Sequence, residues 1–131
     1  MQNLPNHIKT VILDSTGEVT KSKWIGTFRV KCLTSHSDKF AVQRMYTSLL
    51  PSNSDNDELR VRAATLAELA VRIVDGPSWW ESTGKGMYMA DVAPLYKLLE
   101  LCNSAADEWA EELEKQSIMG EGDVTPTPKY P

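Results

Sequence analysis

The feature that most constrains the fold is a change of hydrophobic periodicity about a third of the way along the chain. In residues 24–32 the apolar side chains recur at every second position, which places them on one face of a β-strand. This face carries Trp24, Gly26, Phe28, Val30 and Cys32. Farther along, apolar residues recur at spacings of three and four, which is typical of amphipathic helices. Strands followed by helices indicate an α+β fold.

Another strand is expected at residues 8–13, before the strand at residues 24–32. Residues 8–13 are rich in β-branched side chains, and the sequence Asp14-Ser15-Thr16-Gly17 after them predicts a turn. We therefore expect a small N-terminal antiparallel hairpin or a three-stranded meander. Because a two-stranded ribbon is only marginally stable, this sheet must pack against other elements.

About three helices are expected in the rest of the chain. The first is capped by Ser35 or Ser37 and runs to about Leu50, where Pro51 ends it. Its apolar side carries Val42, Met45, Tyr46 and Leu49.

The second helix is expected to begin at Asp55, because Glu58 three residues later completes a sequence similar to a capping box. Its apolar stripe is formed by Leu59, Ala63, Leu66, Ala70 and Ile73. The helix is expected to stop at Asp75-Gly76-Pro77, because glycine favours the C-terminal cap and proline cannot continue a helix.

The third helix is expected to start at Asp91, whose carboxylate caps it, with Pro94 in the first turn. Its apolar stripe is formed by Leu95, Leu99, Cys102, Ala106, Trp109 and Leu113. Residues 1–119 thus form a single α+β domain.

Residues 120–131 are predicted to form an extended tail, because they contain two glycines and three prolines. Four of its residues are candidate contacts to a neighbouring subunit, since proline lowers the cost of ordering an extended segment. They are Val124, Pro126, Pro128 and Tyr130.

The charges are divided unevenly along the chain. Residues 1–50 carry seven basic and three acidic side chains, and residues 51–131 carry seven basic and fifteen acidic ones, for an overall charge of −4. This division suits oriented association, and an acidic solvated helix beside a lysine-bearing sheet explains it equally well. The overall charge argues against nucleic acid as the main partner. The apolar stretches are far shorter than the roughly 18 residues of a membrane span.

The sequence offers few groups for catalysis or for a cofactor. Gly84-Lys85-Gly86 lacks the upstream glycine and the hydroxyl residue of a phosphate-binding loop. Cys32, His36, Cys102 and His7 lack the paired spacing of a zinc site. Both cysteines lie on apolar faces, so we interpret them as core residues. We expect no catalytic residues, no cofactor and no metal.

Two adjacent tryptophans stand out in residues 77–87. One interpretation places one ring between the second and third helices and the other over the sheet. The alternative makes one of them an interface anchor, because tryptophan is enriched in binding hot spots. Trp79 and Trp80 are therefore candidate partner-binding residues.

The order of these motifs resembles a group of small structural-module proteins of tailed bacteriophages. The similarity spans roughly residues 8–115, and Pro77-Ser78-Trp79-Trp80 is its sharpest motif. The other matching segments are Asp14–Glu18, Gly26–Lys31, the Arg44 helix, Ala63–Val74 and Asp91-Val92.

The resemblance implies a non-enzymatic accessory protein, made in the host cytoplasm and located in the virion. It would bind a major capsid or tail subunit, with self-association as a further option, and stabilise the particle. A phage tail assembly chaperone, absent from the mature virion, is the alternative. A small host-directed inhibitor or adaptor is a weaker third hypothesis.

Overall fold

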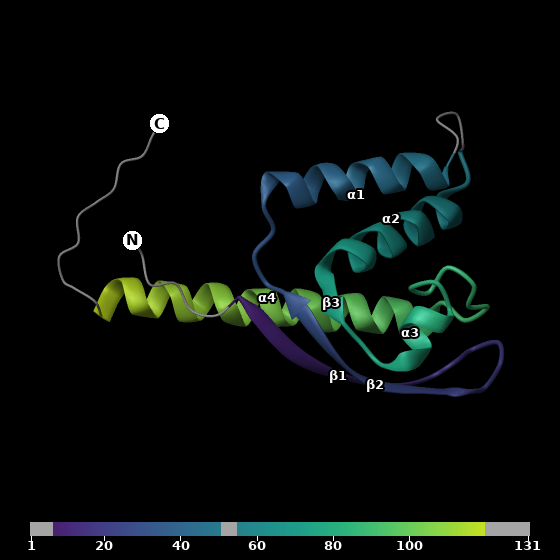
Figure 1. Cartoon of the computed structure of the whole chain (residues 1–131), viewed down its shortest axis with the longest axis horizontal. Helices are drawn as coiled ribbons and strands as arrows, with labels where there is room; N and C mark the ends of the chain where they lie inside the picture. The colour runs from purple at the N-terminus through teal and green to yellow at the C-terminus, as the bar shows by residue number, and fades with distance from the viewer. Residues whose placement is uncertain (1–6, 51–54, 120–131) are drawn as a thin grey trace.

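The computed structural model describes residues 7–50 and 55–119 and confirms the α+β class (Figure 1). Its elements, in chain order, are β1 (Ile8–Thr16), β2 (Lys23–Lys31), α1 (His36–Leu49), α2 (Asp57–Arg72), β3 (Ile73–Asp75), α3 (Ser78–Ser82) and α4 (Ala93–Met119).

The three strands form one antiparallel sheet in the order β1-β2-β3. The alternation in β2 is confirmed, since Phe28 and Val30 are fully buried while Thr27 and Arg29 are exposed. β1 continues to Thr16, which pairs with Lys23, so the predicted turn at Asp14 was placed too early. The strand extends because β2 supplies hydrogen-bonding partners along its whole length.

β3 is not predicted from the sequence pattern, which indicates a helix as far as Asp75. The helix ends at Arg72, and Ile73 then pairs with Val30 of β2. The open edge of β2 offers these residues a strand partner, and Ile73 and Val74 are β-branched, which favours a strand. Since α1 and α2 separate β3 from β2 in the chain, the sheet is not a meander.

The molecule is layered, with α4 across the inner face of the sheet, α2 beside it, and α1 stacked outermost on α2 (Figure 1). The core lies between the sheet, α2, α3 and α4, and contains Leu13, Phe28, Val30, Leu69, Ile73, Trp80, Leu95, Leu98, Cys102 and Ala105. Cys102 is a core residue, as predicted, and Cys32 is half-buried against the core.

The basic and acidic parts of the chain meet at the surface, where β1 lies beside α4. Lys9 of β1 forms an ion pair with Glu112 of α4, at 3.0 Å between Nζ and Oε1. Lys97 of α4 donates to the carbonyl of Asp14 in β1 at 3.0 Å. The Lys9–Glu112 pair thus joins the basic and acidic parts of the chain, and both contacts link α4 to β1.

The helix starts follow the sequence only in part. Ser35 caps α1, and its hydroxyl and the Asp38 carboxylate form a reciprocal capping box. The cap of α2 is Asn56 rather than Asp55, because its side-chain oxygen accepts from Leu59 N at 3.1 Å. Neighbouring Asn and Asp are equally good caps, so local preference does not separate them.

Candidate functional site

Trp80 lies in the core, where 1% of its surface is exposed. Its ring packs edge-on against Phe28, with 5.7 Å between the ring centroids. Trp80 comes from α3, a short helix that Pro77 precedes. Because the surrounding residues cover its indole ring, the Trp80 side chain contributes to packing and offers no surface to a partner.

Trp79 covers the sheet beside Trp80. Its ring packs edge-on against Trp24 at 4.9 Å and Phe28 at 5.6 Å, and it is half-buried. The indole Nε1 donates to the carbonyl of Ile25 at 2.9 Å. The arrangement matches the packing interpretation, with one ring in the core and the other over the sheet.

The remaining candidate contacts, Val124, Pro126, Pro128 and Tyr130, lie outside the described residues.

The Asp91 side chain is buried and accepts hydrogen bonds from the β1–β2 turn. Oδ1 accepts from Val19 N at 2.7 Å and from Thr20 N at 2.9 Å. Oδ2 accepts from the Thr20 hydroxyl and from Trp24 Nε1 at 2.9 Å. Burial by itself raises the pKa of this carboxyl, but the hydrogen bonds from Thr20, Trp24 and Val19 outweigh it and hold the pKa well below its usual range.

The predicted cap of α4 was wrong, because Asp91 does not bind the amides of its own helix. Glu18 from the β1–β2 turn takes that role, accepting from Val92 N at 2.8 Å and Ala93 N at 2.9 Å. These two bonds hold the pKa of Glu18 below its usual value. Glu18 and Asp91 thus bind each other's backbone segments, and we name this arrangement the Glu18–Asp91 clasp.

The Gly84-Lys85-Gly86 turn uses its amides internally. Lys85 N donates to the carbonyl of Trp80 at 2.7 Å, and Gly86 N donates to the Thr83 hydroxyl at 3.3 Å. The backbone φ angles of Gly84, Lys85 and Gly86 are all positive, and Gly86 is buried against Leu95. The segment is a tight packing turn that joins α3 to the α4 region.

Both cysteine side chains pack in or against the core. Burial raises the pKa of the Cys102 thiol to about 11, so the thiol stays protonated at neutral pH. Burial also raises the pKa of Cys32. Among the described residues, no three His, Cys, Asp or Glu side chains gather in a way that could hold a metal ion. Within the same part of the chain, no helix is long and apolar enough to cross a membrane.

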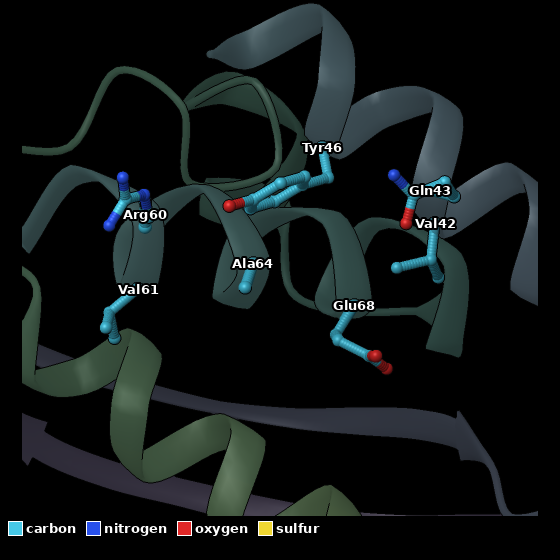
Figure 2. A pocket seen from close by; sticks show the side chains of 7 residues that line it. All are labelled: Val42, Gln43, Tyr46, Arg60, Val61, Ala64 and Glu68. Atoms are coloured by element: carbon cyan, nitrogen blue, oxygen red, sulfur yellow. The ribbon is translucent and has the colours of Figure 1, made fainter. Parts of the chain in front are cut away.

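A shallow, largely apolar groove of about 370 Å³ lies between α1 and α2. α1, all of which the structure describes, has no buried residue, and α2 is its main packing partner. Figure 2 shows side chains from both helices around the groove: Val42, Gln43, Tyr46, Arg60, Val61, Ala64 and Glu68.

The groove continues toward the start of α1. A second hollow of about 230 Å³ shares Val42 and Glu68 with the first and adds Thr34, Asp38 and Lys39. We call the two hollows together the α1–α2 groove. Its apolar side chains include Val61, which is 52% exposed, and the small side chain of Ala64 leaves its middle open (Figure 2).

Charged groups lie at both ends of the α1–α2 groove. At the start of α1, Asp38 is paired with Lys31 at 2.9 Å, and this hydrogen bond lowers the pKa of Asp38. At the other end, Arg60 is paired with Asp57 at 2.6 Å. The groove combines apolar walls with polar ends, as binding surfaces for peptide segments do.

The sequence contained a signal for this groove. The spacing of Val42, Met45, Tyr46 and Leu49 predicts one apolar side of this helix, and in the structure every one of these residues is only half-buried. Periodicity shows that one side of this helix is apolar. It does not show whether that side is covered by the protein's own core or lies at the periphery.

No protein family, curated protein or solved structure matches the chain.

Proposed function

We propose that this protein is a non-enzymatic accessory protein of a tailed-bacteriophage particle. In this proposal it binds an extended segment of a neighbouring capsid or tail subunit in the α1–α2 groove. The sequence resemblance around Pro77-Ser78-Trp79-Trp80 supports the phage context. The groove supports binding as the mode of action.

The exposure of α1 carries the proposal. Its 14 residues include none that is buried, and Val42 and Tyr46, which line the groove, are only half-buried. A helix that covered the protein's own core would bury a whole apolar stripe. α1 instead leaves much of its apolar surface open beside Val61 and Ala64 of α2, where a bound segment would cover it.

The rest of the molecule holds α2, one wall of the groove, in place. The Glu18–Asp91 clasp fixes the β1–β2 turn to the start of α4, and α2 packs on α4 beneath the groove. Arg72 at the end of α2 donates to Asn103 Oδ1 at 2.7 Å in α4. The α2 wall of the groove is thus held in place before binding, which lowers the entropy cost of ordering that wall.

The experiment measures incorporation into particles of the phage that encodes the chain. Ala64→Trp fills the middle of the groove, and Ala110→Trp places the same side chain on an exposed position of α4, away from the groove. We expect mass spectrometry of purified particles to detect the wild-type chain and Ala110→Trp in many copies. The Ala64→Trp chain should fall by about tenfold, a loss typical of blocking a binding hot spot.

Thermal unfolding of both variants separates lost binding from lost folding. If the wild-type chain is absent from mature particles, the accessory role is wrong and the assembly chaperone is favoured. Equal incorporation of the two folded variants would show that the groove is not the binding surface.

A further inference from the structure

We propose that the outer face of α1 binds the acidic face of α4 in a second copy of this chain. The outer face of α1 is centred on Phe40, with Lys39 beside it and Arg44 one turn farther along. The acidic face belongs to the second half of α4 and consists of exposed carboxylates: Glu100, Asp107, Glu108 and Glu111. Phe40 and Arg44 line neither hollow of the α1–α2 groove, so this contact goes beyond the proposed function.

The outer face of α1 has an apolar centre that is open to solvent in the described structure. Phe40 is 65% exposed, and Arg44 and Thr47, four and seven residues later, are exposed as well. These spacings place all three on one side of the helix. The half-buried Val42 and Tyr46 lie on the other side, toward α2. Aromatic residues and arginine are enriched where proteins bind one another, so this face has the composition of an interface.

The acidic face of α4 lies opposite the side by which this helix joins the core. Ala105 is buried, whereas Asp107 and Glu111 are exposed. Six carboxylates lie between residues 98 and 116, and of these only Glu112 forms an ion pair within the described part of the chain. Carboxylates three or four residues apart on a helix repel one another. A cationic partner therefore stabilises this face.

The two faces match in the sign and spacing of their charges. Within residues 7–50 and 55–119, Lys39 and Arg44 form no ion pair. These two cations are five residues apart, about 7.5 Å along the helix axis. Asp107 and Glu111 are four residues apart, about 6 Å along theirs. Each cation can therefore meet a carboxylate at the same time, which fixes how the two helices dock.

The acidic face also has room for the ring of Phe40. Ser104 is small and exposed, and it lies four residues from both Glu100 and Glu108, in one row along α4. A ring placed over Ser104 contacts the methylene groups of the two glutamates and leaves water. Removal of this apolar surface from water supplies the driving force, while the ion pairs supply orientation.

Within one molecule the two faces do not meet, because α2 separates them. α1 packs on α2, α2 packs on α4, and α1 is the outermost helix (Figure 1). The partner is therefore a second copy. Since the contact joins two different surfaces, it is head-to-tail, and it repeats from copy to copy to build rings or filaments.

Sedimentation equilibrium of the full chain tests the proposal. The wild-type dissociation constant should rise at least about tenfold between about 0.02 M and about 0.5 M salt, because salt screens exposed charges. Arg44→Glu and Glu111→Arg should each weaken the association at least about tenfold, because each places like charges opposite one another. Arg29→Glu on β2 and Glu81→Arg on α3 are the matched controls. They make the same charge changes at exposed positions elsewhere and should associate as the wild type does.

An equimolar mixture of Arg44→Glu and Glu111→Arg should associate again, because each chain supplies the intact face that the other lacks. Phe40→Ser should weaken the association about tenfold, as truncation of an interface anchor does. Ala64→Trp, which fills the α1–α2 groove, should associate as the wild type does. Circular dichroism verifies that every variant is folded.

Four results would each overturn the proposal. They are a wild-type chain that stays monomeric at low salt, equal weakening by the control variants, unchanged association of Arg44→Glu, and a mixture that does not associate. Loss of association in Ala64→Trp with normal association of Arg44→Glu would place the self-contact in the groove instead.

Discussion

Glu18 and Asp91 cap each other's backbone across 73 residues of sequence, since Glu18 accepts from Val92 and Ala93 while Asp91 accepts from Val19 and Thr20. Each carboxylate satisfies amides that the local structure leaves without partners. For α4 these are the first amides of the helix, where a negative charge also interacts favourably with the helix dipole. The exchange joins the β1–β2 turn to the helix that covers the sheet.

Gly17 should tolerate no larger residue, because it packs directly against this clasp. A Cβ added there would lie 2.1 Å from Asp91 Oδ2. We expect Gly17→Ala to lower the free energy of unfolding by about 1–3 kcal/mol, the usual cost of overpacking a filled site. Urea denaturation of Gly17→Ala measures this cost, with Ser22→Ala in the same turn as the control. A loss below about 0.5 kcal/mol would contradict the packing at Gly17.

Acid should destabilise the protein through the clasp. The folded-state pKa values of Asp91 and Glu18 are lowered, so both carboxylates contribute stability at pH values above their unfolded pKa values of 3.8 and 4.5. That stability is lost as the pH falls from those values toward the lower folded-state pKa values. Urea unfolding at neutral pH and at several acidic pH values should show a steep decline in the wild type. Asp91→Asn should be less stable at neutral pH and should show a flatter decline; an unchanged pH profile would argue against the clasp.

The two tryptophans should differ in their contribution to stability. Trp80 is 1% exposed, so Trp80→Ala should cost about 3–5 kcal/mol and can prevent folding altogether. Trp79→Phe keeps an aromatic ring over the sheet and removes the hydrogen bond to Ile25, so it should cost only about 1 kcal/mol. Denaturation followed by far-UV circular dichroism compares them. A larger loss for Trp79→Phe than for Trp80→Ala would contradict the assignment of Trp80 to the core and of Trp79 to the cover of the sheet.

Position 72 should require the guanidinium group of arginine for full stability. The side chain is 8% exposed, and its two terminal nitrogens donate to Asn103 Oδ1 at 2.7 Å and to the carbonyl of Cys102 at 3.1 Å. Lysine has a single nitrogen and cannot reproduce this fork. We expect Arg72→Lys to lower the free energy of unfolding by about 1–3 kcal/mol. Arg60→Lys, on the exposed part of the same helix, should change it by less than about 0.5 kcal/mol.

Hydrogen exchange should divide the helices into two groups. α1 has no buried residue in its described length, whereas α4 buries Leu95, Leu98 and Cys102. Local opening costs least where few apolar contacts are broken. The α1 amides should therefore exchange at least about tenfold faster than those of the α4 core, as measured by mass spectrometry or NMR. Equal protection of α1 and α4 would contradict the peripheral position of α1.

The sequence by itself determined the local features of the structure, those that depend only on residues close together in the chain. The alternation of Phe28 and Val30 with exposed polar residues fixed the buried face of β2, and Ser35 with Asp38 fixed the start of α1. Both follow from steric and hydrogen-bonding preferences within a few residues. The core position of Cys102 likewise followed from its place in a helical stripe.

Only the tertiary structure decided the features that join distant segments. Asp91 has the local pattern of a helix cap, but its carboxylate binds the β1–β2 turn because the sheet brings four donors to it. β3 formed because the edge of β2 was open, and α1 stayed outside because the sheet, α2 and α4 already fill the core. Periodicity shows that a face is apolar, whereas the geometry of the packed elements determines what covers it.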